Sequence, residues 1–347
     1  MNTIHSLRVQ HIRAHNDFTL TLSPNVTLVT GPNGSGKTSL IEALYIALQG
    51  TSFKGSDSEV LRRDASWYRV DIGYDNGSQR VVKFDSTKPT GRKQFIVDGK
   101  TQYRLLPRYR YPVVLFEPDD LRLLTGSPAR RRQFIDRFIS QLDIQYGVAL
   151  RRYERALKQR NTLLKRAQVH EDDLFAWNVS LSEYGAYIVA QRQKCIQELN
   201  EQLGLTYETI AHTGDAVAIR YSFSQHTSLQ QRLLADLHAS SEKDRLLGFT
   251  STGPHRHDVL FDFNESPALS VASRGETRSI ILGLKFLEVA IIEKLTEQKP
   301  IILLDDVFSE LDETRQNHLI DFTKQNQVII TSATGSHAVT TATTVKL

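Results

Sequence analysis

The stretch Gly31-Pro32-Asn33-Gly34-Ser35-Gly36-Lys37-Thr38 decides the fold, because it matches the pattern G-x-x-x-x-G-K-[ST] at every fixed position. The β-branched segment Val26–Thr30 precedes it, and a helical stretch from Thr38 to Leu48 follows it. In such a strand–loop–helix unit the glycines turn successive backbone N–H groups inward, and the helix dipole adds positive potential. The sequence therefore predicts a phosphate-binding loop in an α/β fold.

The side chains of this loop predict how a nucleotide is held. Lys37 supplies a mobile cation for the β- and γ-phosphates, and Thr38 supplies a hydroxyl ligand for Mg²⁺. The other expected nucleotide contacts are Gly31, Pro32, Asn33, Gly34, Ser35, Gly36 and Ser39. The alternative is a chance glycine-rich turn before a helix, which the complete match disfavours. ATP and Mg²⁺ are the cofactors that this pattern indicates.

A second part of the site is predicted far along the chain. The apolar strand Ile301–Leu304 ends in Asp305 and Asp306. Because ligands lie outside the carboxyl ends of parallel strands, Asp305 is placed to hold hydrated Mg²⁺, and Asp306 to orient or deprotonate the attacking water. Alone, these residues indicate an apolar strand that runs into an acidic loop. The upstream phosphate loop favours the catalytic interpretation.

Two further segments lie on either side of the acidic strand. Ser273-Arg274-Gly275-Glu276 precedes a helix, and Ser309-Glu310-Leu311-Asp312 follows the strand. A Ser with a Gly at a helix start forms another anion-binding end. An economical explanation is that Ser273 contacts the γ-phosphate of a nucleotide bound by a second copy of the chain. Read alone, the segment indicates an ordinary N-cap with Glu in the first turn.

Length and texture predict two lobes. The chain has 347 residues, of which 40% are hydrophobic and 24% charged, which is typical of a folded protein. Residues 1–124 are rich in short strands, residues 125–247 are mainly helical, and residues 248–347 alternate strand and helix again. We expect the first and last ranges to form one α/β lobe, with a mixed sheet and helices, and the middle range to be an inserted helical lobe.

Several classes of protein are excluded. The single cysteine, Cys195, permits neither an intramolecular disulfide nor a Cys-based zinc site. The apolar runs are too short for a membrane helix, and the N-terminus lacks the apolar region of a signal peptide. We therefore expect a cytoplasmic protein that does not associate with a membrane.

The order of these segments resembles that of the ABC- and SMC-type ATPases. Walker A (31–38), a signature (273–276), Walker B (301–306) and a D-loop (309–312) follow in the order of that family. Thr331-Ser332 replaces the His-bearing switch of many transporter ATPases. The resemblance implies an ABC-type P-loop ATPase head and a homodimer that encloses two nucleotides. It also implies that Gly275 and Asp312 contact nucleotide, and that Arg13 lies on or near it.

Further segments resemble the RecF family of bacterial recombination mediators, and the resemblance extends over nearly the whole chain. They are Arg8–Arg13, Phe116–Leu121, Gly126–Pro128, Arg130–Asp136, Gly253–Arg256 and Asp305–Asp312. His257 is a departure, because family members usually follow Gly-Pro-His-Arg directly with Asp. The resemblance implies an ATP-dependent dimer that binds single-stranded and duplex DNA at gap junctions. It implies work with RecR and RecO, assistance to RecA loading, and weak DNA-stimulated ATP hydrolysis that releases the dimer.

A basic stretch gives a candidate DNA surface. Residues 104–166 hold 15 Lys and Arg against 6 Asp and Glu, a local charge of +9, whereas the whole chain carries +4. The arginines expected to meet DNA phosphates are Arg130, Arg131, Arg132, Arg151 and Arg152. The alternative is an ordinary solvated helix face.

Three other functions are weighed against a DNA-repair ATPase. A transporter subunit would need a His switch and a short coupling insert, and a P-loop kinase would have no use for a signature. The third is an SMC-like defence or chromosome ATPase. The insert is too short for a long coiled coil, and we expect Gly147, Gly185, Gly204 and Gly214 to interrupt its helices.

Overall fold

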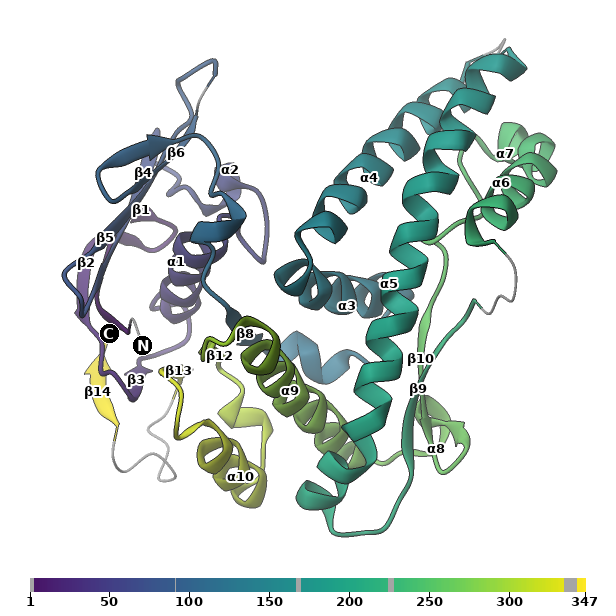
Figure 1. The fold of residues 1–347 in the computed structure, drawn as a ribbon. Coiled ribbons are helices and arrows are strands. Elements are labelled where there is room, and N and C mark those ends of the chain that lie inside the picture. The colour runs from purple at the N-terminus through teal and green to yellow at the C-terminus, as the bar shows by residue number, and fades with distance from the viewer. Residues whose placement is uncertain (1–2, 91, 167–169, 224–227, 334–341) are drawn as a thin grey trace. The chain divides into compact units, whose positions relative to one another are not determined.

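The structure is a computed structural model that describes residues 3–90, 92–166, 170–223, 228–333 and 342–347 (Figure 1). The chain divides into two compact units. The two-sheet unit comprises Met1–Leu121 and Glu288–Leu347, and the helical unit comprises Arg122–Leu287. The helical unit is thus inserted in the sequence between the two parts of the other unit.

A parallel sheet of five strands carries the phosphate-binding loop in the two-sheet unit. Its spatial order is β14 (Thr343–Lys346), β3 (Val26–Thr30), β13 (Val328–Ser332), β12 (Ile301–Asp305) and β8 (Val113–Phe116). All four pairings are parallel. The three central strands are almost entirely buried, which explains their continuous runs of Val, Ile and Leu.

An antiparallel sheet of six strands forms the second layer of this unit. Its order is β2 (His15–Thr21), β1 (Ile4–Ile12), β4 (Trp67–Tyr74), β5 (Gln79–Asp85), β6 (Lys93–Val97) and β7 (Lys100–Gln102). A hairpin turn at Asn76-Gly77 joins β4 to β5, and Gly77 has a φ of 80°, which favours glycine.

Helix α1 (Lys37–Gln49) lies between the two sheets (Figure 1). Every residue of the helix except Thr38 is buried, so the helix has no face that is turned to solvent. It belongs to the main hydrophobic core together with the inner faces of both sheets. The burial fixes the direction of α1, and therefore the position of the loop at its first turn.

The remaining elements of the two-sheet unit are short, apart from one helix. They are α2 (Asp57–Val60), η1 (Pro107–Tyr109), η2 (Pro118–Arg122, which ends at the unit boundary), η3 (Phe308–Glu310) and α10 (Glu313–Thr323). Helix α9 (Arg274–Thr296) begins in the helical unit and ends in the two-sheet unit.

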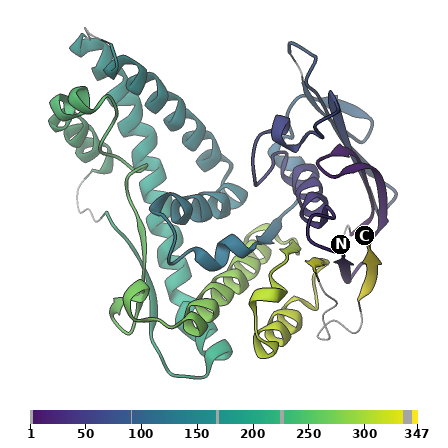
Figure 2. The same cartoon turned by 180° about the vertical axis from the view of Figure 1, so that it is seen from behind.

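Two long helices dominate the helical unit. Helix α4 (Ile144–Leu164) packs along the 41-residue α5 (Glu171–Ala211), as both views show (Figure 1 and Figure 2). The other elements are α3 (Pro128–Leu142), β9 (Val217–Tyr221), α6 (Leu229–Ala239), α7 (Ser241–Leu247), β10 (Val259–Phe263), β11 (Ser266–Pro267) and α8 (Ala268–Val271).

Glycines do not interrupt these helices as the sequence predicted. Gly147 lies inside α4, and Gly185 and Gly204 lie inside α5. A Cβ at Gly185 would come within 3.2 Å of Leu233 and 3.3 Å of Tyr153, so this glycine permits close packing. Of the four glycines named, only Gly214 lies outside a helix.

The helical unit extends beyond the range that the sequence predicted for it. Its first residue, Arg122, is close to the expected 125, but its last is Leu287 instead of 247. The reason is the antiparallel pairing of β9 with β10, from Val259 opposite Tyr221 to Phe263 opposite Val217. This ladder holds β10, and with it the start of α9, in the helical unit.

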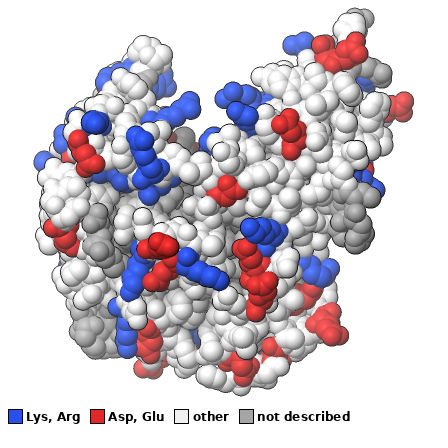
Figure 3. Space-filling model, in the orientation of Figure 1, with Lys and Arg blue, Asp and Glu red and all other residues white. Residues whose placement is uncertain are grey.

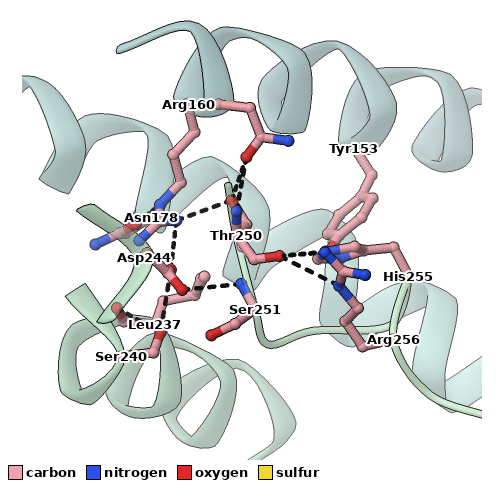
Figure 4. A network of polar contacts seen from close by, with 11 residues as sticks. Tyr153, Arg160, Asn178, Leu237, Ser240, Asp244, Thr250, Ser251, His255 and Arg256 are labelled. Carbon is pink, nitrogen blue, oxygen red and sulfur yellow. Dashed lines mark hydrogen bonds and ion pairs between the residues drawn. The ribbon is translucent and has the colours of Figure 1, made fainter. Parts of the chain in front are cut away.

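A buried polar network ties α4, α5 and α7 to the segment that contains Gly-Pro-His-Arg (Figure 4). The Arg160 guanidinium donates to Asp244 at 2.7 Å, to Thr250 Oγ1 at 2.8 Å and to Asn178 at 2.7 Å. The side chains of Arg160 and Asp244 are both fully buried. His255 then links the Tyr153 hydroxyl to the Thr250 carbonyl.

His255 and the inserted His257 are both held as neutral rings. Burial lowers the pKa of His255 to about 4 and that of His257 to about 3. His257 lies 2.9 Å from the Tyr221 hydroxyl through Nδ1 and stacks on Phe223 with ring centroids 4.5 Å apart. The additional histidine is therefore packed inside the helical unit.

A helix that crosses a membrane needs about 20 consecutive, mainly apolar residues. Among the residues that the structure describes, no helix is long and apolar enough to cross a membrane.

The Arg160–Asp244 pair gives a test of this unit. We expect Arg160→Met to lower the free energy of unfolding by about 3–5 kcal/mol, because it leaves the Asp244 carboxylate buried without its cation. Arg160→Met with Asp244→Leu should cost less than Arg160→Met alone. Urea unfolding measures both, and Arg232→Met, in an exposed pair with Asp236, is the control, with a change below about 1 kcal/mol. A small effect of Arg160→Met would contradict the assignment.

Candidate nucleotide-binding site

Three parallel strands place the predicted site residues at one edge of the five-stranded sheet. Strand β3 leads directly into the phosphate loop, β12 ends at Asp305, and β13 ends at Ser332. Because β13 pairs with both β3 and β12, the carboxyl ends of the three strands lie side by side. The Walker A and Walker B segments predicted from the sequence are therefore brought together within one unit.

Two glycines of the loop adopt a backbone conformation that other residues avoid. Gly34 has a φ of 86° and Gly36 a φ of 98°. No heavy atom lies within 4 Å of a Cβ built at Gly34, whereas a Cβ at Gly36 would lie 2.4 Å from His15 Nε2. His15, on β2, is buried and its Nε2 lies 3.0 Å from the Gly36 carbonyl oxygen. A side chain at position 36 is thus disfavoured both by the positive φ and by the clash with His15.

The polar groups of the loop fit a polyphosphate. The Lys37 ammonium is buried beneath the loop and donates to the carbonyls of Gly31 at 2.7 Å and Pro32 at 3.0 Å. The Ser35 hydroxyl is buried and forms no hydrogen bond with the described part of the chain. The first turn of α1 adds backbone N–H groups at its N-terminus. These donors suit the oxygens of a nucleotide, and the loop conformation needed for them is present.

The two residues predicted to bind Mg²⁺ are in direct contact. Thr38 Oγ1 donates to Asp305 Oδ1 at 2.8 Å, although 267 residues separate them in sequence. Thr331 Oγ1 donates to the same oxygen at 3.0 Å. A hydroxyl, a single carboxylate and substrate phosphates are a usual donor set for Mg²⁺, which keeps several waters. The chemistry of this pair therefore fits the predicted metal.

Asp306, the predicted base, has an unusual backbone conformation. Its φ of 52° lies in the left-handed region, which costs a residue other than glycine of order 1–3 kcal/mol. The Asp306 N–H donates to the backbone oxygen of Thr331 at 3.1 Å and to its hydroxyl at 3.0 Å. Its carboxylate accepts from the Ala333 N–H at 3.3 Å. The Asp306 carboxylate is thus held at the Ala333 N–H, whereas the Asp305 carboxylate is held by the Thr38 and Thr331 hydroxyls.

Sequence reasoning missed a cation at this edge. The Lys54 ammonium lies 3.4 Å from Asp305 Oδ2, and its side chain is 37% exposed. Lys54 belongs to the turn after α1, which the Ser52 hydroxyl organises by accepting from the N–H groups of Lys54 and Gly55. The signal in the sequence that could have identified Lys54 was its position in a turn rich in Gly and Ser directly after the predicted helix.

Arg13 is fixed to the phosphate-loop helix by a carboxylate. Its guanidinium makes two hydrogen bonds to Glu42, at 2.6 and 3.0 Å, and Ser52 donates to the same carboxylate at 2.5 Å. Glu42 is fully buried on α1, and the pairing raises the pKa of Arg13. Arg13 therefore lies over α1, one turn beyond Thr38. Glu42 was not singled out from the sequence, because it reads as an ordinary helix residue.

The signature segment of the helical unit forms a capping box at the start of α9. The Ser273 hydroxyl accepts from the Glu276 N–H at 3.3 Å, and the Glu276 carboxylate accepts from the Ser273 N–H at 2.6 Å. Gly275 lies in the first turn. In the two-sheet unit, Asp312 likewise caps α10 by accepting from the Arg315 N–H at 3.0 Å. Each segment thus has a local structural role.

The chain was compared with known proteins. A family model described as an AAA domain matches residues 6–211. The DNA replication and repair protein RecF of Lachnoclostridium phytofermentans is 32% identical over 94% of this chain and 92% of that protein. RecF of Staphylococcus aureus strain JH9 is 31% identical over 91% and 89%.

The chain belongs to the RecF family. Two solved structures extend the match: recombination mediator RecF with ATP in the RecFOR pathway, at 27% identity and a TM-score of 0.86, and RecF with ATPrS, at 28% and 0.88. They cover 97% and 100% of this chain, and the chain covers 93% and 96% of them. An Smc head bound to the C-winged helix domain of ScpA shares the fold alone, at 14% identity and a TM-score of 0.52 over 96% of this chain and 90% of that one. The fold is the predicted α/β ABC-type P-loop ATPase head.

The arginines that we expected to contact DNA differ in their exposure to solvent. Arg131 is buried, and its guanidinium binds Asp258 through two hydrogen bonds of 2.8 Å and the Gly126 carbonyl at 2.7 Å. This contradicts a DNA contact for Arg131. Arg132 is half-buried and donates to the His257 carbonyl, and Arg130 is also partly buried. Arg151 and Arg152 are exposed on α4.

Basic side chains gather over α4 on the face shown in Figure 3. Arg151, Arg152, Arg155 and Lys158 are all exposed on this helix. Arg152 lies over the Tyr184 ring at 5.6 Å. Across the rest of that face, acidic and basic side chains are interspersed (Figure 3). The exposed cations of the predicted basic stretch therefore lie on α4 and also outside it, at Arg104, Arg108, Arg122, Lys165 and Arg166.

The contact between Gly36 and His15 gives a test of the loop. We expect Gly36→Ala to abolish binding of a fluorescent ATP analogue and to lower the melting temperature more than Gly34→Ala, because only position 36 adds a steric clash to backbone strain. His15→Ala in the Gly36→Ala background should recover part of the lost stability. Equal effects of the two glycine substitutions on the melting temperature would contradict this interpretation.

Proposed function

We propose that this member of the RecF family is an ATP-dependent, DNA-binding recombination mediator. The observation that carries the proposal is the contact of Thr38 with Asp305 beside a complete phosphate loop, in a chain that matches RecF proteins over nearly its whole length. Two ATP-bound chains form a dimer that binds DNA at single-strand gaps. The dimer recruits RecR and RecO and assists RecA loading in the cytoplasm.

Several residues are assigned to nucleotide binding. Residues 31–39 surround the phosphates with backbone N–H groups, Lys37 donates to the β- and γ-phosphate oxygens, and Arg13 contacts the nucleotide from above α1. Thr38 and Asp305 hold Mg²⁺, which supplies positive charge against the phosphate oxygens. Thr331 keeps the Asp305 carboxylate in place through its hydroxyl.

Hydrolysis requires a water, a base and a complete phosphate shell. Asp306 accepts a proton from the water as its oxygen bonds to the γ-phosphorus, and the bond to the departing ADP oxygen breaks. Ser273 and Gly275 of the second chain donate to the γ-phosphate, and Asp312 lies at the same junction. Loss of the γ-phosphate removes these contacts, so the chains separate. Slow, DNA-stimulated ATP hydrolysis therefore times residence on DNA.

The dimer is tested by mass. We expect light scattering to show a doubling of wild-type mass with ATP and no change for Lys37→Met. Ser273→Asp should bind ATP and remain monomeric, because Asp still caps α9 but repels the γ-phosphate. Ser273→Thr, which keeps a hydroxyl cap, is the matched control and should still dimerise. A wild-type protein with no nucleotide-dependent dimer would sink the proposal.

The DNA surface is tested by charge reversal on α4. We expect Arg151→Glu with Arg152→Glu to weaken binding to gapped duplex about tenfold and to reduce the slope of log K against log salt concentration by about 2. Lys194→Glu with Arg232→Glu changes the net charge equally at exposed positions elsewhere on the helical unit and is the control. Fluorescence anisotropy across a salt series provides the measurement. Equal affinity and slope for the two double variants would remove α4 from the DNA surface.

A further inference from the structure

A cavity of about 760 Å³ lies in the two-sheet unit at the opposite end of α1 from the phosphate loop. It is bounded by the β4–β5 turn, the end of β6, the segment 108–111 and the connection 297–299 between α9 and β12. The 13 residues of α1 make a helix about 20 Å long, so the cavity is separate from the nucleotide site. Its volume lies in the usual range for small-ligand sites.

Positive charge exceeds negative charge around this cavity. The cationic lining residues are Arg80, Arg108, Arg110 and Lys299, and the anionic ones are Asp98 and Glu297. Asp98 and Glu297 are both exposed. The positive field of a cleft attracts anionic ligands, and guanidinium groups match the oxygens of phosphate particularly well.

Arg80 is a buried cation that makes no ion pair within the described residues, although the nearby Asp98 carboxylate acts to raise its pKa. Its guanidinium donates to the backbone oxygens of Ala47, in the last turn of α1, and Tyr109. Its Nε–H is buried with no acceptor, and no carboxylate in the described part of the chain forms an ion pair with it. Burial accordingly lowers the pKa of Arg80. Carbonyl oxygens at the helix end offset its charge only in part.

A second buried donor lines the same cavity. Among the residues that the structure describes, none forms a hydrogen bond with the Tyr74 hydroxyl, and Tyr74 is only 5% exposed. Burial raises the pKa of Tyr74, so the hydroxyl keeps its proton and remains a donor. Two buried donors without acceptors are uncommon in one place, because nearly all buried polar groups in proteins are hydrogen-bonded. Because both atoms are buried, an oxyanion in this cavity would supply the missing acceptors once the Tyr74 and Arg80 side chains shift toward it.

We propose that this cavity binds a phosphate monoester, such as a phosphorylated DNA end or a free nucleotide. Side-chain donors line the cavity from three of these segments, which are the β4–β5 region, 108–111 and 297–299. A single carboxylate has only two oxygens to accept from them, whereas a terminal phosphate offers three charged or polar oxygens. The partly buried rings of Tyr109 and Tyr111 also line the cavity and give it an aromatic wall. Arg108 already lies over the Tyr109 ring, at 4.9 Å.

The site is distinct from the assigned nucleotide site and from the α4 surface. If the cavity did not bind a phosphate, the proposed ATPase function would be unaffected, because none of the cavity residues belongs to the phosphate loop or to the Walker B strand. The connection 297–299 precedes the first residue of β12, at the opposite end of that strand from Asp305.

The test compares two oligonucleotides that differ only in the terminal group. We expect an octathymidylate with a 5′-phosphate, labelled at its 3′ end, to bind the full chain about tenfold more tightly than the 5′-hydroxyl form, which corresponds to about 1.4 kcal/mol. Arg108→Glu with Lys299→Glu should abolish the difference. The matched control, Lys83→Glu with Lys324→Glu, makes the same charge change outside the cavity and should keep it.

Two further arms make the outcome decisive. Lys37→Met disables the phosphate loop, so a preference that vanishes in this variant would assign recognition to the loop and overturn the proposal. Thymidine 5′-monophosphate as competitor separates the sources: competition equal to that of the oligonucleotide indicates a free nucleotide, and weaker competition indicates a DNA end. Equal binding of the two oligonucleotides by the wild-type protein would also overturn the proposal. So would displacement of both oligonucleotides by hexaglutamate.

Discussion

The structure depends on the parallel pairing of β13 with β3 on one side and with β12 on the other. This ladder brings residues that are about 270 positions apart in the chain to one edge of a sheet, where Thr38 donates to Asp305. The phosphate loop, the predicted metal ligands and Asp306 all take their positions from it. Burial of α1 between two sheets then fixes the loop from behind, because a helix without a solvent face cannot turn about its axis.

The parts of the site that the sequence predicts are those set by local pattern. Eight consecutive residues specify the loop, and an apolar strand that ends in two carboxylates specifies its partner. His15, Glu42 and Lys54 were not identified, since each acts through a contact with a residue far from it in sequence. A histidine in a strand, a glutamate in a helix and a lysine in a turn carry no such information by themselves.

The charge of the helical unit illustrates the same limit. Counting residues predicted a basic surface, but Arg131 and Arg160 are buried against Asp258 and Asp244 and stabilise the unit internally. The strands Val26–Thr30 and Ile301–Leu304 and the helix from Thr38 to Leu48 were predicted to within one residue, because their patterns are local. The boundary at Leu287 was not predicted, because it depends on the pairing of β9 with β10, which no local pattern reveals.

The strand order of the parallel sheet has a consequence for synthesis of the protein. Strands β3 and β8 lie in the first 121 residues, but neither pairs with the other, and β12 and β13 come between them. As the chain leaves the ribosome, β3 therefore has no parallel partner strand until residues 328–332 of β13 have emerged. The helical unit, which ends at Leu287, is synthesised before that moment, so the parallel sheet can assemble only after the whole helical unit has been made.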